Sequence, residues 1–198
     1  MAFMDIAKGR RSIRKFTNEP IPQETLDYIM EAALWAPSGQ NLQPWYFVVL
    51  RSDEDIRFLV DTLGTTAFSE RKKLEQRFKN NPEIVEETME FERALGGSHC
   101  IVLAFLHKQY SDELLPSCTE SVAAAMQNMV LAAYEQGVAS CWVEAVRRGE
   151  DALRERFAPG KGSLIGAVIL GYAAMEPRPI KRKQGRVDWR DGGEAAHA

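Results

Sequence analysis

The sequence has few of the residues from which side-chain nucleophiles and metal sites are usually built. Its 198 residues include only three cysteines and three histidines. Cys100, Cys118 and Cys141 lie far apart, and none belongs to a C-x-x-C pair, so we expect reduced thiols in the core of an intracellular protein. His99 and His107 flank a short apolar run without further ligands nearby. The chain therefore offers no candidate catalytic residue and no metal site, and cofactor chemistry becomes the alternative.

The familiar phosphate and hydrolase motifs are also absent. A P-loop ending at Gly160 and Lys161 would need glycine at position 155, which is Glu155. The glycines of that region precede an apolar run instead of following one, which excludes a Rossmann dinucleotide fingerprint. Neither H-E-x-x-H nor G-x-S-x-G occurs.

Excess charge of one sign and long apolar runs are missing as well. The formal net charge is -3 and the isoelectric point is near 5.7, which argues against a protein whose main ligand is DNA or RNA. No run approaches the roughly 20 apolar residues of a membrane span, and the first ten residues hold no apolar stretch of signal-peptide length. We therefore expect a cytoplasmic protein that does not bind membranes.

Hydrophobic periodicity predicts alternating helices and strands within one domain, 1–198. Strands are expected at 45–50, 100–106, 138–143 and 164–170, where short apolar runs are rich in β-branched and aromatic residues. Helices are expected at 22–34, 53–63, 70–95 (broken near 80–82), from a capping box at Ser117 and Glu120 to Gly137, and at 151–157. This order indicates an α/β or α+β fold.

Three polar segments stand out between these elements. The basic arm, 10–16, reads RRSIRKF and carries four cations and a hydroxyl that suit phosphate oxygens. The polar loop, 36–45, reads APSGQNLQPW and supplies amides able to pair with a pyrimidine edge. The basic tail, 177–183, reads PRPIKRK. Each segment taken alone is also compatible with a solvated basic arm, an ordinary polar loop or a disordered tail.

Taken together, the three segments resemble the nitroreductase family in order and spacing. QGVASCWVEA, between the loop and the tail, is similar to the family's stretch beside the flavin. The resemblance covers about residues 5–189. It implies an α+β sandwich, with a mixed, mainly antiparallel central sheet flanked by helices, and an interlocked homodimer with FMN at the interface. Residues 68–97 would form a variable, lid-like helical insert, and 177–198 a basic C-terminal extension.

The resemblance also implies which residues bind the cofactor. Arg10 and Ser12 would contact the phosphate and ribityl chain with Arg11 beside them, and Arg14 would lie near flavin N1 and the C2 carbonyl. The remaining implied contacts are Pro37, Ser38, Gly39, Asn41 and, more weakly, Gln43 from the partner's loop; Trp142, Glu144 and Ala145 near N5; and Lys181 and Lys183 at the phosphate, where Arg182 is an alternative. Trp142 is equally compatible with a core aromatic.

The implied activity is hydride transfer from NAD(P)H through bound FMN to a small acceptor such as a nitroaromatic or quinone, in ping-pong turnover. Two alternatives stay open: an FMN-binding redox sensor or carrier without rapid turnover, and a nucleic-acid-binding protein that uses the basic arm. In the insert, Ser69 and Lys72 resemble flavin-edge contacts of some members, although a solvated helix face accounts for them equally well.

Overall fold

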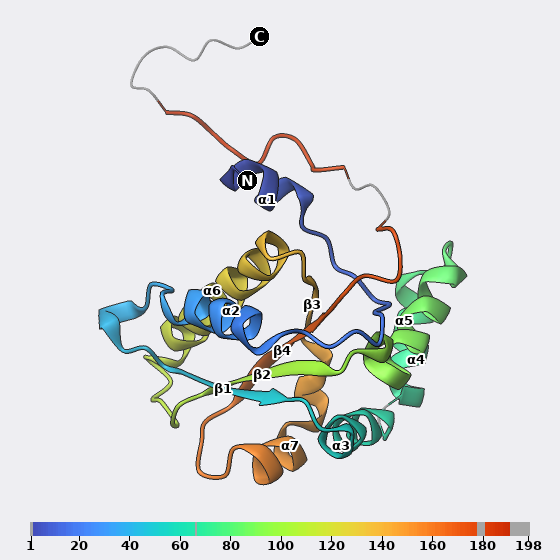
Figure 1. The fold of residues 1–198 in the computed structure, drawn as a ribbon, viewed down its shortest axis with the longest axis horizontal. Coiled ribbons are helices and arrows are strands. Elements are labelled where there is room, and N and C mark those ends of the chain that lie inside the picture. Colours follow the sequence, from blue (N-terminus) through green and yellow to red (C-terminus); the bar gives the residue numbers. More distant parts are fainter. Residues whose placement is uncertain (1, 66, 178–180, 191–198) are drawn as a thin grey trace.

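The structure, a computed structural model, describes residues 2–65, 67–177 and 181–190, without the side chains of 67–70. Its helices and strands alternate as the periodicity predicts (Figure 1). In chain order they are α1 (Phe3–Gly9), α2 (Gln23–Leu34), the 3₁₀ helix η1 (Gly39–Asn41), β1 (Trp45–Leu50), α3 (Asp53–Gly64), α4 (Ala67–Arg77), α5 (Pro82–Ala94), η2 (Leu95–Gly97), β2 (Cys100–Leu106), α6 (Leu115–Glu135), β3 (Ala139–Val143), η3 (Ala145–Gly149), α7 (Glu150–Phe157) and β4 (Leu164–Gly171).

Within the described residues the sheet has four strands in the order β1-β2-β4-β3. Each neighbouring pair is antiparallel. The parallel component of the expected mixed sheet is an isolated bridge between Ser12 and Ser140. The α+β class and the mainly antiparallel sheet are thus confirmed, and the mixed character is confined to this bridge with the N-terminal arm.

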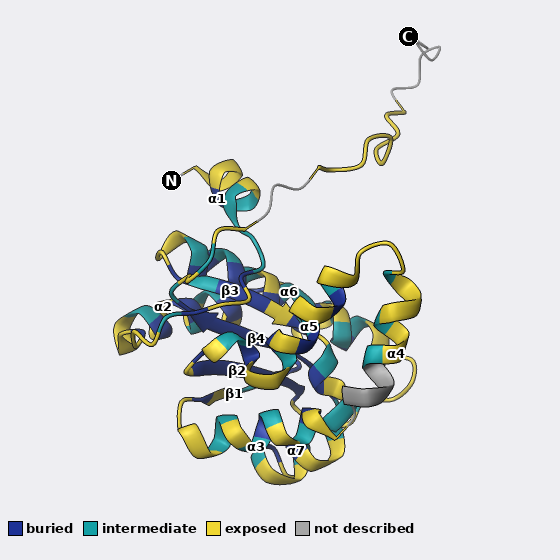
Figure 2. Ribbon diagram, turned by 90° about the vertical axis from the view of Figure 1, so that its right-hand side faces the viewer, coloured by how far each residue is buried: buried dark blue, intermediate teal, exposed yellow. Residues whose placement is uncertain are grey.

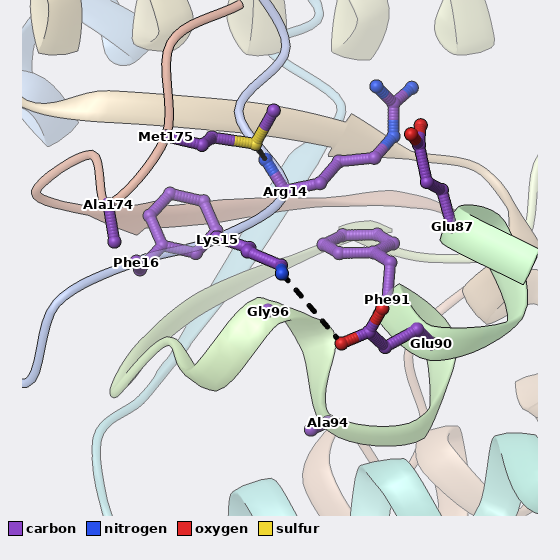
Figure 3. A pocket seen from close by; sticks show the side chains of 10 residues that line it. All are labelled: Arg14, Lys15, Phe16, Glu87, Glu90, Phe91, Ala94, Gly96, Ala174 and Met175. Atoms are coloured by element: carbon purple, nitrogen blue, oxygen red, sulfur yellow. Dashed lines mark hydrogen bonds and ion pairs between the residues drawn. The ribbon is translucent and has the colours of Figure 1, made fainter. Parts of the chain in front are cut away.

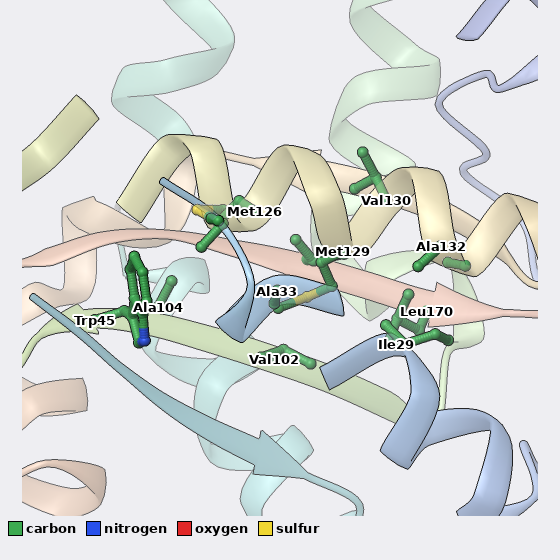
Figure 4. Packing of buried hydrophobic residues seen from close by; sticks show 14 of the residues in the cluster. Ile29, Ala33, Trp45, Val102, Ala104, Met126, Met129, Val130, Ala132 and Leu170 are labelled. Atoms are coloured by element: carbon green, nitrogen blue, oxygen red, sulfur yellow. The ribbon is translucent and has the colours of Figure 1, made fainter. Parts of the chain in front are cut away.

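One face of the sheet is covered by α2 and α6. Alternate side chains of a strand point to opposite faces, and Val102, Ala104 and Leu106 of β2 pack with the helices on this side. Figure 4 shows Met126 and Met129 of α6 lying over β2 and β4. Each fully buried side chain of this size contributes about 1.5–3 kcal/mol, so this layer is fixed mainly by apolar burial.

The other face is covered by α3, α5 and α7. Ile101, Leu103 and Phe105, the other half of β2, belong to this second apolar cluster together with Phe91 and Leu95 at the end of α5. Figure 2 shows the resulting three layers, with α3 and α7 beneath the sheet and α4 and α5 along one side. The two clusters explain why β2 and β4 are apolar throughout: both of their faces are buried.

Two helix starts differ from the sequence prediction. The expected capping box at Ser117 is wrong, because α6 already begins at Leu115 with a proline in its first turn. Proline fits there since its missing N–H would have no partner in any case. Ser117 lies inside the helix, and its carbonyl accepts a 2.7 Å hydrogen bond from Ser121 Oγ. In α2, Pro22 takes the N-cap and not the first helical position.

Cys100, Cys118 and Cys141 are free and buried, as expected. Burial raises the pKa of the Cys100 thiol to about 11, which keeps it protonated and unreactive at neutral pH. Among the described residues, no helix is both long and apolar enough to cross a membrane.

Candidate functional site

The basic arm is held in place by main-chain hydrogen bonds to three segments distant in sequence. Ile13 N–H donates to the carbonyl of Ser140 in β3 at 2.9 Å, and Phe16 N–H donates to the carbonyl of Gly96 at 2.9 Å. Lys15 carbonyl accepts a 2.9 Å bond from Ala174 N–H, beyond β4. Figure 1 shows the arm and the segment after β4 running side by side near α5. The arm therefore has one defined path across the end of the sheet.

Burial alternates along the arm and decides which side chains remain available. Ile13 and Phe16 are buried in the second apolar cluster. Arg14 and Lys15 between them are exposed, and Arg10 is partly buried. The buried Ile13 and Phe16 therefore anchor the arm on both sides of Arg14 and Lys15. The two charged side chains are held at the surface.

Arg14 lines a pocket of about 510 Å³ between the arm, α5 and the segment after β4. Figure 3 shows Phe16, Phe91 and Met175 forming its apolar wall, with Lys15 and Glu90 facing each other across the opening. The Lys15 ammonium lies 3.9 Å from the Glu90 carboxylate. A cavity of this size with an apolar lining and a few charged groups is the usual form of a small-molecule site.

Arg10 lines a second pocket, of about 450 Å³, which shares Met175 with the first. Arg11, Tyr134 and Ser140 contribute to the same wall. Ser140 Oγ is buried and has no hydrogen-bond partner among the described residues. A buried hydroxyl without a partner costs free energy, so this atom marks a place where a ligand oxygen would be stabilised.

The predicted cations differ in how they are used within the protein. The guanidinium groups of Arg10 and Arg14 make no hydrogen bond or ion pair with the described residues, whereas Arg11 turns back and donates to the carbonyls of Lys8 and Arg10. Arg11 thus caps the end of α1. Burial raises the pKa of the Cys141 thiol beneath the arm, while the positive charges of Arg14 and Arg10 act in the opposite direction.

The stretch from Trp142 to Ala145 forms the end of β3 and the start of the turn that follows it. Trp142 is 36% exposed, so its interpretation as a core aromatic is wrong. Glu144 is exposed and pairs with Arg147 at 3.2 Å. The carbonyl of Ala145 accepts a 3.0 Å hydrogen bond from Arg148 Nε. An isolated parallel bridge places Ser12 beside Ser140 near the start of β3, and Arg10 lines its pocket with residues 137–140, whereas Glu144 and Ala145 follow the end of the strand.

The polar loop after α2 is tightly organised by its own side chains. Ser38 Oγ accepts from Gln43 N–H at 3.0 Å, and Gln43 Nε2 donates to Asn41 Oδ1 at 3.0 Å. Gln40, Asn41 and Gln43 all have positive φ, between 46° and 54°, which costs about 1 kcal/mol or more at each residue without glycine's freedom. A loop that holds three such residues is preorganised for a specific contact surface.

The loop does not reach either pocket of its own chain. Gly39 packs against Ser117, where an added Cβ would lie 2.3 Å from its Oγ. Tyr134 of the Arg10 pocket stands at the other end of α6, about 25 Å away along the helix axis. The exposed Pro37 lies in the same loop. The loop and the arm are thus separate in one protomer.

Pro177, the first residue of the basic tail, lines the Arg10 pocket, but the described cations of the tail line neither pocket. Lys181, Arg182 and Lys183 are exposed, and Figure 2 shows their segment lying away from the sheet and its helices. They make no hydrogen bond or ion pair with other described residues. The neighbouring positions 178–180 of the predicted tail lie outside the described residues.

The sequence did not reveal the pocket wall supplied by Glu90 and Phe91 of α5 and by Gly96 of η2. An added Cβ at Gly96 would lie 2.5 Å from the carbonyl oxygen of Arg14. Lys72 is exposed on α4, and the side chain of Ser69 lies outside the described residues. Among the residues whose side chains are described, no group of three or more potential metal ligands occurs.

Comparison with known proteins places this site in context. The model of the nitroreductase family matches residues 7–172. An NADH dehydrogenase of Thermus thermophilus is 30% identical over 188 residues, covering 89% of each chain. A 4-nitrobenzoate reductase of Nocardioides is 28% identical over 200 residues, covering 86% of this chain and 80% of its own.

A solved structure shares the fold. A nitroreductase with bound FMN from Desulfitobacterium hafniense superimposes with a TM-score of 0.77 at 21% identity. The superposition covers 96% of this chain and all of the other. At this level of identity the likeness supports the three-layer arrangement described above.

Proposed function

The chain belongs to the nitroreductase family, and on that premise we propose that it is an FMN-dependent oxidoreductase that uses NAD(P)H to reduce a small aromatic or quinone-like acceptor. The observation that carries the proposal is the pair of guanidinium groups, Arg10 and Arg14, which have no partner among the described residues and line two adjacent pockets. An elongated ligand with an anionic end and a flat apolar end fits such a site.

The residues present fit FMN. The phosphate would be held by Arg10, since an arginine fork matches phosphate oxygens in bidentate geometry. Ser12 and the buried Ser140 hydroxyl would hold ribityl or phosphate oxygens. The apolar wall of Phe16, Phe91 and Met175 would accommodate the ring end of the cofactor.

Bound FMN would supply the capacity to accept a hydride from a nicotinamide and to deliver it to an acceptor. The protein's contribution is then positioning and electrostatics. Arg14 places a fixed positive charge where negative charge develops on reduction, which favours the reduced state. The stretch from Trp142 to Ala145 supplies main-chain groups at the opposite edge. Ping-pong turnover, with donor and acceptor using the same open pocket in succession, is part of the proposal.

We further propose that the functional unit is a homodimer. The loop from Pro37 to Gln43 lies about 25 Å along α6 from the Arg10 pocket of its own chain, which suits a loop that completes the partner's site. Phe3, Tyr28 and Trp35 expose large apolar surfaces on and beside α1 and α2, and Trp35 is 80% exposed. Contiguous exposed apolar groups mark interaction surfaces. Lys181 and Lys183 are proposed as phosphate contacts from the extension.

The first test is a visible spectrum of the purified protein, followed by anaerobic addition of NADH and then NADPH. Flavin bands that bleach within the mixing time, and return on adding a nitroaromatic or quinone, are expected. Bands that resist both nicotinamides would favour a redox sensor. A colourless protein that takes up no added FMN would overturn the proposal.

The variant Arg10→Ala/Arg14→Ala tests the site. Because hydrogen bonds to charged groups contribute about 1.5–3 kcal/mol each, FMN binding should weaken by about a hundredfold or more while the fold is retained. The control Arg57→Ala/Arg77→Ala changes net charge equally on helices away from both pockets and should retain FMN. Full FMN occupancy in the first variant would contradict the site assignment.

A further inference from the structure

Helix α5 contacts both segments that the proposed function assigns to the flavin ring. At the end of the helix, the carbonyl of Gly96 accepts the Phe16 N–H at 2.9 Å. Six residues earlier in the chain, Glu90 of α5 faces Lys15 of the basic arm at 3.9 Å, as Figure 3 shows. These contacts tie α5 to the arm immediately beside Arg14.

The opposite contact of α5 is an ion pair with the segment after β3. Arg148 Nη2 lies 2.8 Å from Glu92 Oε1, and the two side chains are only 17% and 13% exposed. By comparison, the side chains of the Lys15–Glu90 pair are 62% and 68% exposed. The Arg148–Glu92 pair is thus more buried than the Lys15–Glu90 pair.

The same guanidinium also holds the main chain. Arg148 Nε donates to the carbonyl of Ala145 at 3.0 Å, while Nη2 faces Glu92. The Nε hydrogen bond is directional, whereas the contact of Nη2 with Glu92 is an ion pair without hydrogen-bond geometry. Since a guanidinium is planar and rigid, the two contacts together link the Ala145 carbonyl to the helix. Ala145 belongs to the turn that is proposed to pass the ring edge near N5.

Stability alone gives a weak account of this pair. Removing two charges from water costs several kcal/mol, and their attraction repays the cost only with good geometry and additional hydrogen bonds. Apolar residues of similar volume would hold a helix against a turn at least as well. What the ion pair adds is a fixed orientation of the main chain at Ala145 with respect to α5.

We propose that Glu92 and Arg148 are positioning residues for the flavin ring, and that α5 acts as a strut that sets the spacing between Arg14 and the Ala145 turn. The proposal rests on the proposed function and extends it to the helical insert, to which it assigns a role in holding the cofactor site. Neither side chain needs to touch the flavin. Each acts through Ala145 or through the arm.

The experiment compares Glu92→Gln, Arg148→Met and the double variant with the unchanged protein. Three quantities are measured: the Kd for FMN on the apoprotein, the visible spectrum of bound FMN, and its midpoint potential. Each single variant should weaken FMN binding by about tenfold, as loss of an outer support typically does, and should change the spectrum and potential. The double variant should be no worse than either single one, because its members act as one unit.

A matched control is available on α7. Arg154 pairs with Glu150 at 3.2 Å, with exposures of 30% and 23%, and neither side chain lines a pocket. Glu150→Gln and Arg154→Met should lower the melting temperature without altering the spectrum or potential. Arg148→Lys, which keeps the charge and loses the planar fork, provides a variant that folds if Arg148→Met does not. It should reproduce the spectral change.

The outcomes separate the two proposals. If the unchanged protein binds no FMN, both proposals fail. If it binds FMN and accepts electrons from NAD(P)H, but the Glu92 and Arg148 variants behave as the α7 controls do, the positioning role alone fails. Weaker binding with an altered spectrum and potential, absent from the controls, would support it.

Discussion

Helices α6 and α4 are held by different forces. Nine residues of α6 are buried, and all of them except Ser121 belong to one apolar cluster with α2 and the sheet. By contrast, no side chain is buried between residues 71 and 77 of α4. That helix is tied to α5 by Arg71, which pairs with Glu75 and Glu86.

The difference shows that one fold can combine a rigid layer, α2 and α6, with a helix, α4, whose sequence can vary. Apolar burial is insensitive to salt and to small changes of charge, so the α2–α6 layer sets the geometry of the sheet. Exposed ion pairs contribute little free energy and are screened by salt. Helix α4 can therefore change sequence at low cost in stability, whereas α5, which walls the Arg14 pocket, is anchored by the buried Val85, Met89 and Phe91.

The largest expected contrast comes from the same substitution on both sides. Met129→Ala removes a fully buried side chain from the α2–α6 cluster and should cost about 2–5 kcal/mol. Met89→Ala on α5 removes a side chain that is 4% exposed and belongs to neither cluster, so about 1–2 kcal/mol is expected. Urea unfolding measures the free energy of unfolding of both variants. Equal losses of stability in the two variants would contradict the expected difference between α6 and α5.

A second contrast separates backbone strain from close packing. Gly96 and Gly137 both have φ near +70°, but a Cβ at Gly96 would lie 2.5 Å from the carbonyl of Arg14, whereas Gly137 has open space. Gly137→Ala should cost about 1–2 kcal/mol from φ alone. Gly96→Ala should cost about 2–4 kcal/mol and also weaken FMN binding, because the arm must move. Similar costs, with unchanged FMN binding, would show that the arm tolerates the displacement.

The smallest expected effect concerns the ion pair between α4 and α5. The hydrogen bond from Arg71 holds the pKa of Glu86 below its ordinary value of 4.5. The pair therefore stabilises the protein above pH 4.5, and this contribution is lost as the pH falls through the lowered pKa. Glu86→Gln should remove that pH dependence and part of the salt dependence of unfolding. It should not change the free energy of unfolding that Met129→Ala removes. An unchanged pH profile in Glu86→Gln would disprove the role of the pair.

The strands and most helices could be predicted from the sequence because each has a strong local signal. The strands 45–50 and 100–106 are apolar and bounded by polar residues, and the structure has them with the same bounds. Helix α1 was missed because a seven-residue helix with one buried residue, Ile6, gives almost no periodicity. The start of α6 was misplaced because Ser117 and Glu120 have the spacing of a capping box, although they lie within a helix that begins at Leu115 and has Pro116 in its first turn.

The site was predictable only in part, because some of its residues form a local motif and others meet only in the folded chain. Arg10 and Arg14 belong to a compact motif, so their candidacy could be inferred from the sequence. The pairing of Glu92 with Arg148 joins residues 56 positions apart, on α5 and η3. Such contacts depend on how two elements pack, and neither residue type nor spacing reveals them in a single sequence. The assignments of Asn41 and Lys181 stay predictions.

The path of the basic arm has a consequence for the order of folding. Ile13 bonds to residue 140, Phe16 to residue 96, and Lys15 to residue 174, so the arm has no stable place until β3, β4 and the end of α5 have formed. Contacts this distant in sequence are slow to close. During synthesis the arm leaves the ribosome before the segments to which it bonds. The proposed cofactor site is thus completed only after residue 174 has been made, and a nascent chain exposes Arg10 and Arg14 before any pocket surrounds them.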